Sequence, residues 1–489
     1  MAASADLVVR GGTVVTERGQ ARLDIGIRDG RIVALEDTLP AAEREIDAAG
    51  RLVLPGGIDS HCHIEQLSGM GVMNADDFAS GSVSAAFGGT TTTISFACQH
   101  RGQSLKAVVA DYHERAAAKS VIDYAFHMIL TDPTDEVLNV ELPKLVEDGH
   151  GSIKLFTTYP GTKLDDGQML DVMAKARELG AMICVHAEND AIIQWMVKRL
   201  LGGRYTEPRY HAVSHPRFAE IDAIHRLIQM SAFLDQPVTI FHVSTAEGAE
   251  LVRQARASGL KIYAETCPQY LFFTWESLDR PGLEGAKWMF SPPPRHAADS
   301  EALWRALVDG TLQTVTSDHA PYRFDASGKL KAGPSPTFKE IANGIPGLEL
   351  RLPLLFSEGV SAGRLSIEQF VRLTATEPAR LYGLHPRKGD IVQGADADLV
   401  LWDARREVVV EDGTTHDATG YTPYAGMTLR GWPETVLRRG EVIVEHGRCL
   451  AERGSGTFLP RAAGPYAAPS GRLSPETDPA RNFGARILA

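Results

Sequence analysis

Long apolar runs are absent from the sequence, and cysteine is scarce. No stretch approaches the roughly 20 consecutive apolar residues that span a membrane, so we expect no membrane-embedded segment. The 489 residues include only five cysteines, an odd number with no disulfide pattern. The first residues enter a strand pattern directly, without the basic stretch and apolar core of an export signal. We therefore expect a protein of the reducing cytoplasm.

An excess of positive charge is also missing. Lysine and arginine number 50 against 62 aspartates and glutamates, which gives a formal net charge of -12. This balance argues against nucleic acid or an anionic membrane as the main partner. Composition is otherwise that of a globular protein, with 44% hydrophobic and 23% charged residues. The chain is long enough for a large barrel and a smaller second domain.

Short strands joined by tight turns are predicted at both ends of the chain. Near the N-terminus, Asp29-Gly30 lies between two apolar runs and predicts a hairpin. Asp412-Gly413 and Arg439-Gly440 follow strand-like runs in the same way. We therefore predict one small β-sandwich domain built from residues 1–54 and 390–450, with the residues between them inserted as a unit.

The inserted residues alternate apolar runs with helical segments. A helix is predicted over Thr245–Gly259, where threonine precedes an apolar stripe and glycine ends it. Eight strands are predicted, over Leu52–Ile58, Thr90–Phe96, Val121–Leu130, Ser152–Thr157, Ala181–Val185, Pro237–Phe241, Leu260–Ala264 and Leu312–Thr316. This alternation predicts a (β/α)8 barrel over residues 55–389. A doubly wound sheet is the alternative, although no Gly-x-Gly-x-x-Gly motif or P-loop follows the first strand.

The last part of the chain, residues 451–489, is rich in proline, glycine, alanine and arginine. We predict an extended tail there. Such a segment is either disordered or docked on a neighbouring subunit, and the sequence leaves both alternatives open.

Side chains with metal-binding chemistry follow several of the predicted strands. His61 and His63 end the first strand, and side chains two apart on a strand point to the same face. Further candidates end strands four, five, six and eight: Lys154, His186, His242 and Asp318. Because barrel active sites lie at the carboxyl ends of the strands, these side chains are expected to converge on a metal site.

Lys154 is the most informative member of this set. An ammonium group in an apolar strand is costly to bury and tends to lose its proton. A neutral lysine amine can add carbon dioxide and become a carbamate, an anionic oxygen ligand able to bridge two metal ions. We therefore expect a two-metal centre with a carbamylated Lys154.

Several motifs give the chain a specific resemblance to a known family. They are His61-Cys62-His63, Ser152-Ile-Lys154-Leu-Phe, Val185-His186-Ala-Glu-Asn189, Phe241-His242-Val-Ser244, Ser317-Asp318-His319, Glu265-Thr-Cys-Pro-Gln-Tyr-Leu271, Phe290-Ser-Pro-Pro-Pro-Arg295 and Asn343-Gly-Ile-Pro-Gly-Leu-Glu349. With these motifs the chain resembles the cyclic amidohydrolases, and among them the D-hydantoinase/dihydropyrimidinase group. The similarity runs from Asp6 to about Glu445, nearly the whole chain.

The resemblance implies a ligand set for two zinc ions, which manganese or cobalt could replace. One ion would be held by His61, His63, carbamylated Lys154 and Asp318, and the other by Lys154, His186 and His242. A hydroxide bridging the two ions would be the nucleophile. It would open the ring of a small cyclic amide, a 5-substituted hydantoin or a dihydropyrimidine, to an N-carbamoyl amino acid.

The resemblance also assigns roles to other side chains. Asp318 would accept the proton of the attacking water and pass it to the leaving nitrogen. Tyr159 would bind the substrate and stabilise the oxyanion through its hydroxyl group. Backbone groups of Ser291 and Asn343 would hydrogen-bond the cyclic –CO–NH– unit of the substrate. A homotetramer or homodimer is expected from the same resemblance.

Departures from the family pattern lie mainly after the first strand. Cys62 stands where threonine is usual, Ala320 stands where cysteine is frequent, and residues 66–74 replace a Pro-Phe loop. That loop contacts the ring substituent in the family, so the substrate is left open. Glu65 occupies the position of a carboxylate-binding arginine in dihydroorotases, where it is expected to repel that substrate.

Other functions remain as alternatives. Allantoinase and cyclic-imide hydrolase activities use the same machinery. The dihydropyrimidinase-related proteins are cytoskeletal adaptors that share the fold but have lost metal ligands, whereas all six ligand positions are filled here.

Overall fold

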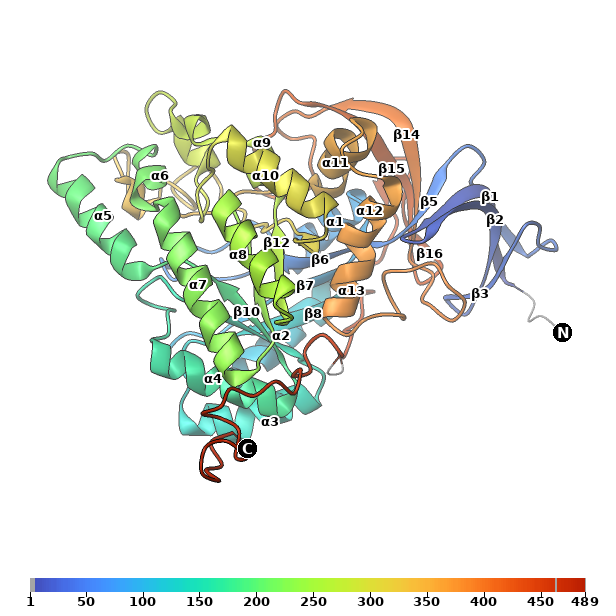
Figure 1. Cartoon of the computed structure of the whole chain (residues 1–489). Helices are drawn as coiled ribbons and strands as arrows, with labels where there is room; N and C mark the ends of the chain where they lie inside the picture. Colours follow the sequence, from blue (N-terminus) through green and yellow to red (C-terminus); the bar gives the residue numbers. More distant parts are fainter. Residues whose placement is uncertain (1–4, 462–463, 489) are drawn as a thin grey trace.

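A parallel sheet of eight strands forms the centre of the molecule (Figure 1). The computed structural model describes residues 5–461 and 464–488. The strands run in sequence order, and every neighbouring pair is parallel. They are β6 (Gly57–Cys62), β7 (Thr90–Cys98), β8 (Asp123–Ile129), β9 (Ser152–Phe156), β10 (Met182–His186), β11 (Val238–Ile240), β12 (Ile262–Thr266) and β13 (Thr314–Val315).

The two outer strands of this sheet approach one another at their carboxyl ends. Cys62 in β6 forms a parallel bridge with His319, which follows β13. The His63 amide donates to the His319 carbonyl oxygen at 2.7 Å. The sheet therefore curls into a barrel, as the alternation of strands and helices predicted, rather than into an open doubly wound sheet.

Helices lie around the outside of the barrel (Figure 1). They are α1 (Phe78–Phe87), α2 (Leu105–Lys119), α3 (Leu142–Glu147), α4 (Asp166–Leu179), α5 (Asp190–Gly202), α6 (Tyr210–Ser214), α7 (Arg217–Leu234), α8 (Ala246–Ala257), α9 (Pro268–Phe272), α10 (Ala297–Val308), α11 (Arg351–Leu355), α12 (Ile367–Val371) and α13 (Glu377–Leu381). The predicted cap of α8 is confirmed, because the Thr245 hydroxyl oxygen accepts from the Gly248 amide at 3.0 Å. In the described part of the chain, no helix combines the length and apolarity needed to cross a membrane.

The first predicted strand, Leu52–Ile58, is two strands in two different sheets. Leu52–Pro55 is β5, which pairs outside the barrel, and β6 starts at Gly57. Between them, a Cβ atom on Gly56 would lie 2.1 Å from the Thr91 hydroxyl oxygen. Only glycine fits where the chain passes from one sheet to the other.

The second sheet joins both ends of the chain, as predicted. Its nine strands are β1 (Leu7–Thr16), β2 (Gly19–Arg28), β3 (Arg31–Glu36), β4 (Arg44–Asp47), β5, β14 (Leu399–Val409), β15 (Thr428–Arg438), β16 (Glu441–Glu445) and β17 (Arg448–Cys449). β5 pairs with β1 in parallel and with β14 in antiparallel orientation. β1 continues through Gly11-Gly12 with a bulge. The domain boundaries at 54–55 and 389–390 stay a prediction.

A buried lysine connects the second sheet to the barrel. The Lys388 ammonium lies 2.7 Å from carboxylate oxygens of both Asp123 and Asp398, and 3.2 Å from Asp396. Burial opposes the charge, but the three carboxylates raise the pKa of Lys388 above its ordinary value. Asp123 starts β8, so this ionic junction lies at the amino-terminal end of the barrel.

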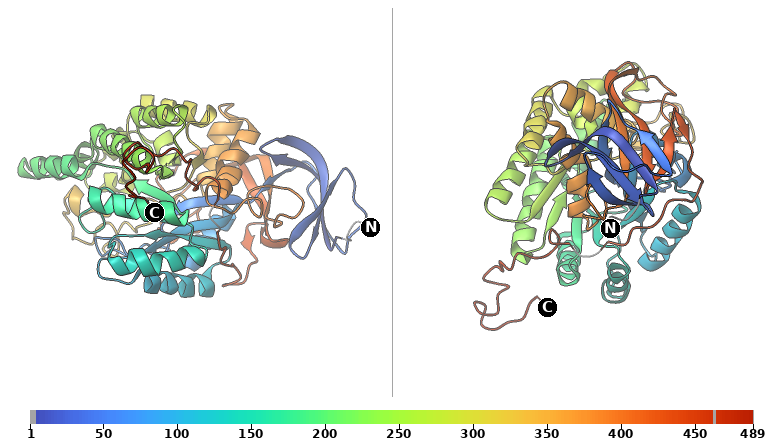
Figure 2. Two further views of the ribbon diagram at one scale, coloured as in Figure 1. Left: turned by 60° about the horizontal axis from the view of Figure 1, so that its bottom comes forward. Right: turned by 90° about the vertical axis from the view of Figure 1, so that its right-hand side faces the viewer.

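The tail docks on its own chain. Phe458 forms a parallel bridge with Tyr124 of β8, and the Leu459 amide donates to the Tyr124 carbonyl oxygen at 2.8 Å. The buried Arg461 guanidinium donates to the Ser152 hydroxyl oxygen at 2.9 Å and to the Phe126 carbonyl oxygen. Residues 451–461 therefore pack against the amino-terminal end of their own barrel, a contact that neither earlier alternative included. Further along the tail, the Ser470 amide donates to the Asp235 carboxylate at 3.0 Å, at the carboxyl end of α7, and Figure 2 shows the last part of the tail projecting away from the barrel.

Candidate metal centre and active site

A cavity of about 420 Å³ opens at the carboxyl ends of the barrel strands. Every site residue proposed from the sequence lines it: His61, His63, Lys154, Tyr159, His186, His242, Ser291, Asp318 and Asn343. These residues come from seven places in the chain that are distant in sequence. The cavity therefore lies where the strand-end argument expected the metal site, and it also includes the three residues suggested by the family resemblance.

Asp318 lies between the two histidines of the first barrel strand. One of its carboxylate oxygens is 3.0 Å from His61 Nε2 and 3.5 Å from His63 Nε2. Burial disfavours the charged carboxylate, but the two imidazoles hold the pKa of Asp318 well below its usual range. Asp318 is therefore an anion that faces two nitrogen donors, as in a site for a cation.

Three residues of the cavity have left-handed backbone conformations. The φ angles are 73° at Tyr159, 40° at His242 and 47° at Asp318. Residues other than glycine adopt such angles at a cost of about 1–3 kcal/mol each and retain them where the surrounding structure demands it. In each case the chain has just left a barrel strand, and the turn directs the side chain into the cavity.

Lys154 lies in the centre of β9 with no polar partner. Its side chain is 1% exposed, and Nζ has no hydrogen-bond partner among the described residues. The nearest ring is that of Phe241, whose centroid is 4.0 Å from Nζ. Burial lowers the pKa of Lys154 to about 8. The amine is therefore partly neutral near physiological pH, which is the state that reacts with carbon dioxide.

His242 and His186 face one another across the same cavity, with ring centroids 4.4 Å apart. Burial, followed by the charges of His186 and Lys154, holds the pKa of His242 well below its ordinary value. Its Nδ1 atom has no hydrogen-bond partner in the described structure. Ligand atoms of His61, His242 and Asp318 lie within 4.8 Å of one another.

This donor set fits bound metal ions. Buried polar atoms almost always have hydrogen-bond partners, yet Lys154 Nζ and His242 Nδ1 have none. Both residues line a cavity that also holds other imidazoles and an ionised carboxylate. Imidazole and carboxylate groups are common ligands of zinc and of related divalent metals.

Two buried glutamates, to which the sequence analysis gave no role, orient the histidines. Glu265 in β12 accepts from His61 Nδ1, and Glu188 Oε2 accepts from His186 Nε2 at 2.8 Å. Such carboxylates fix the ring orientation and the tautomer of a metal-binding histidine. A signal for Glu188 was present, since it stands two residues after His186 in the same motif.

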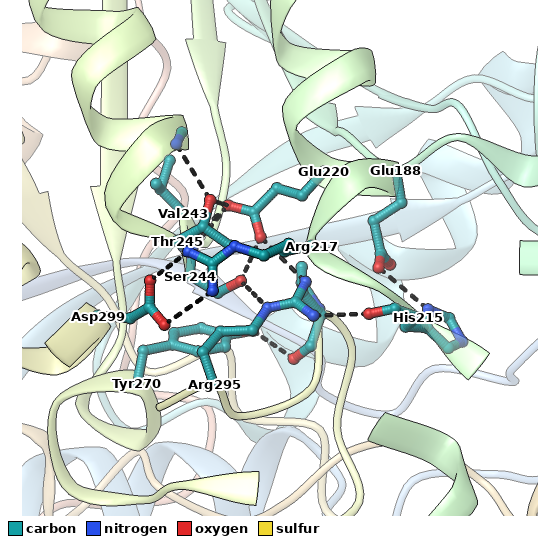
Figure 3. Close-up of polar contacts among 12 residues, drawn as sticks. Glu188, His215, Arg217, Glu220, Val243, Ser244, Thr245, Tyr270, Arg295 and Asp299 are labelled. Atoms are coloured by element: carbon teal, nitrogen blue, oxygen red, sulfur yellow. Dashed lines mark hydrogen bonds and ion pairs between the residues drawn. The ribbon is translucent and has the colours of Figure 1, made fainter. Parts of the chain in front are cut away.

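A network of buried charges continues from Glu188 behind the cavity (Figure 3). Glu188 Oε1 accepts from His215 Nδ1 at 3.0 Å, and the His215 carbonyl oxygen accepts from the Arg295 guanidinium at 2.6 Å. Arg295 pairs with Glu220 at 3.2 Å and donates from Nε to the Ser244 hydroxyl oxygen at 3.0 Å. The orienting partner of His186 and the turn after His242 are therefore joined through one guanidinium group.

Glu220 also fixes the turn that follows His242. Its carboxylate accepts from the backbone amides of Ser244 at 2.9 Å and Thr245 at 3.2 Å. Thr245 is the N-cap of α8 and Ser244 directly precedes it, so the carboxylate lies at the amino-terminal end of this helix. The sequence analysis gave no role to Glu220 or Arg295, because they are distant in the chain and only the fold pairs them.

The proposed substrate-binding residues line the cavity beside the ligands. The Tyr159 ring centroid is 5.2 Å from that of His186, and burial raises the pKa of Tyr159 well above its ordinary value. Its hydroxyl group therefore keeps its proton and can donate a hydrogen bond. Ser291 and Asn343 lie on two different loops of the cavity wall.

The loop after the first barrel strand contributes to the cavity, but Glu65 does not. Gln66, Ser68, Gly69 and Met70 line the cavity. The Glu65 carboxylate instead lies 2.7 Å from the Lys119 ammonium. The expectation that Glu65 repels a substrate carboxylate is therefore wrong, since its charge is neutralised outside the cavity wall.

Comparison with known proteins assigns the family. Residues 52–443 match the model of the amidohydrolase family. The chain belongs to this family, and membership implies a binuclear metal centre.

Relatives place the chain more narrowly. A D-hydantoinase from Ralstonia pickettii is 43% identical over 93% of this chain and 99% of its own length. A D-phenylhydantoinase from Escherichia coli is 38% identical over 93% and 98%. The crystal structure of a dihydropyrimidinase from Brevibacillus agri, 39% identical, superposes with a TM-score of 0.91 over 94% of this chain and 99% of the other. Within the family, the chain belongs to the D-hydantoinase/dihydropyrimidinase group, and it is a hydrolase of that type with the barrel fold of the group.

Proposed function

We propose that this enzyme hydrolyses the ring amide of 5-substituted hydantoins or dihydropyrimidines and releases N-carbamoyl amino acids. The observation that carries this proposal is the convergence of four histidines, a partnerless lysine and an ionised aspartate in one cavity. The names of the relatives, hydantoinases and a dihydropyrimidinase, indicate the cyclic amide as the substrate class.

The metals that we propose are two zinc ions. His61, His63, Lys154 and Asp318 would hold one, and Lys154, His186 and His242 the other. Bound there, the ions would supply the Lewis acidity that makes a water molecule nucleophilic at neutral pH. As a carbamate, formed when its neutral amine adds carbon dioxide through an N–C bond and releases one proton, Lys154 would offer oxygen ligands to both ions. The lowered pKa of Lys154, about 8, favours this modification.

Asp318 is the proton carrier in this proposal. Its carboxylate accepts the proton of the attacking water and delivers it to the ring nitrogen when the C–N bond breaks. The low pKa of Asp318 supports the accepting role, because the group is ionised before the reaction begins. Glu265 keeps His61 in the orientation that faces Asp318.

Tyr159, Ser291 and Asn343 hold the substrate ring. The neutral Tyr159 hydroxyl donates to the carbonyl oxygen as negative charge develops on it. Backbone groups of Ser291 and Asn343 bind the cyclic –CO–NH– unit. The substrate therefore needs an unsubstituted ring amide, whereas the enzyme needs no particular side chain at positions 291 and 343. The ring substituent would lie toward Gln66, Ser68 and Met70.

A substrate panel tests this proposal. Purified enzyme is assayed with dihydrouracil, 5-phenylhydantoin, 5-methylhydantoin, allantoin and succinimide. We expect turnover of at least one hydantoin or of dihydrouracil to exceed that of the other two substrates. Turnover of allantoin or succinimide alone would assign the enzyme to allantoinase or cyclic-imide hydrolysis instead.

Metal analysis separates an enzyme from a non-catalytic adaptor. We expect about two divalent ions per chain by elemental analysis, and a mass increase of 44 Da at Lys154 when the intact protein is analysed under non-denaturing conditions. Protein without stoichiometric metal and without turnover would favour the adaptor.

We further propose that the protein is a cytoplasmic homotetramer or homodimer. All five cysteines are free, in keeping with a reducing compartment. Large apolar side chains such as Trp195 and Phe218 are exposed on α5 and α7 and are available for burial between copies. Light scattering at several concentrations measures the assembly state, and a monomer throughout would contradict the proposal.

A further inference from the structure

Lys329 is a buried lysine without a carboxylate partner. Its residue is 0% exposed, and no ion pair among the described residues includes it. Its ammonium group donates to two backbone carbonyl oxygens, that of Ala342 at 2.8 Å and that of Met289 at 3.3 Å. Burial lowers the pKa of Lys329 to about 7. Placing an amine here is therefore costly, although an apolar side chain of similar length could fill the space.

The two acceptors lie beside the residues proposed to bind the substrate. Ala342 directly precedes Asn343, and Met289 stands two residues before Ser291. The Gly344 amide also donates to the Met289 carbonyl oxygen, at 2.9 Å. The Lys329 side chain therefore connects the Ser291 loop and the Asn343 loop where both reach the cavity wall.

We propose that Lys329 is a positioning residue for substrate binding, which sets the distance between the Ser291 and Asn343 loops through the carbonyl groups of Met289 and Ala342. This inference rests on the proposed function. Ser291 and Asn343 bind one –CO–NH– unit through backbone groups, so their spacing must match that unit. Backbone groups cannot adjust by changing a rotamer, and only the loops themselves can set their spacing.

The segment that carries Lys329 is itself rigid. The Lys329 amide donates to the Arg323 carbonyl oxygen at 2.8 Å and closes the loop between these two residues. A Cβ atom at Gly328 would lie 2.2 Å from that same oxygen, so the turn accepts only glycine there. At the other side of the junction, Gly344 has a φ of 145°, and a Cβ atom there would lie 2.4 Å from the Ala320 carbonyl oxygen. The backbone is therefore conformationally restricted both in the segment that carries Lys329 and in the loop that carries Asn343.

The test compares Lys329→Met with Lys388→Met. Both remove a buried ammonium group, but Lys388 lies in the ionic junction at the opposite end of the barrel. With 5-phenylhydantoin, or with whichever member of the panel the wild type hydrolyses fastest, Lys329→Met should raise KM roughly tenfold, as expected when hydrogen bonds from a charged group are lost. Its kcat and metal content should stay within a factor of about three of wild type. Lys388→Met should lower stability and leave KM unchanged.

The outcomes separate this inference from the proposed function. An active wild type with an unchanged KM in Lys329→Met would overturn the positioning role alone, as would loss of metal together with loss of kcat. A wild type that hydrolyses no cyclic amide would overturn the proposed function and this role with it. If Lys329→Met does not fold, Lys329→Gln, which keeps a shorter donor, carries the same test and should show a smaller rise in KM.

Discussion

Replacing Glu220 by glutamine is expected to destabilise the folded protein by about 3–5 kcal/mol, because it leaves the buried Arg295 charge without its counter-ion. The Glu220 side chain is 2% exposed and that of Arg295 is 7% exposed, so solvent cannot compensate for the lost charge. The amides of Ser244 and Thr245 would also lose a charged acceptor. An exposed pair, Glu301 with Arg364, provides the control.

The assay is urea unfolding of the metal-loaded protein, followed by tryptophan fluorescence. Glu301→Gln removes one partner of an ion pair whose side chains are 52% and 41% exposed, and should cost about 0–1 kcal/mol. The double variant Glu220→Gln/Arg295→Met should cost less than the sum of its single variants, by about 1–3 kcal/mol, because the second change removes the uncompensated charge.

Two results would refute this reasoning. One is a cost for Glu220→Gln no larger than that for Glu301→Gln, which would mean that the buried pair contributes as little as a surface pair. The other is strict additivity in the double variant, which would mean that Glu220 and Arg295 do not interact energetically across their 3.2 Å separation.

Four further predictions concern single residues. Lys154→Ala should lose bound metal and activity together, with partial rescue by added acetate or propionate; full activity without rescue would contradict the carbamate. Asp318→Asn should retain much of its metal, while kcat falls by about 10²–10⁴-fold, the range for loss of a general base or acid; a rate near that of the wild type would exclude the proton-carrying role. The folded pKa of Lys329, about 7, lies below the 10.5 of an exposed lysine, so stability relative to Lys329→Met should rise by about 1.4 kcal/mol per pH unit between these values; equal pH slopes in urea unfolding would contradict the buried amine. Arg461→Met should lower the free energy of unfolding by at least about 2 kcal/mol, because the Ser152 hydroxyl and the Phe126 carbonyl lose a buried charged donor; an unchanged unfolding midpoint would show that the tail does not support the barrel.

Local sequence patterns were enough to predict the barrel strands and the candidate metal ligands at their ends, whereas Tyr159, Ser291 and Asn343 came from the family resemblance. Apolar runs are typical of buried parallel strands, and the candidate metal ligands stand in or directly after these runs. The order of the ligands along the chain therefore gives their order around the carboxyl-terminal end of the barrel. The same patterns could not divide Leu52–Ile58 between two sheets, because Leu52–Pro55 and Gly57–Ile58 form one continuous apolar run and only their strand partners differ.

Contacts between distant segments could not be predicted. Glu220, Arg295 and Lys329 look in the sequence like ordinary surface charges, since charged residues are rarely buried without partners. Their roles depend on which charged group or carbonyl oxygen each side chain contacts in the folded protein. The geometry of the loops determines these contacts. The tail illustrates the same limit, because its composition is typical of disorder, yet Arg461 finds acceptors inside the barrel.

The pairing of β5 with β14 sets the order in which this protein can fold. Leu54 pairs with Val400, so strand β5 leaves the ribosome long before its antiparallel partner exists. At synthesis rates of about 5–20 residues per second, the 345 residues between Leu54 and Val400 take roughly 17–70 seconds. During that time the N-terminal strands present an unpaired edge, which is the usual template for aggregation. Arg461 is synthesised later still, so the amino-terminal end of the barrel is covered only when nearly all of the chain has been made.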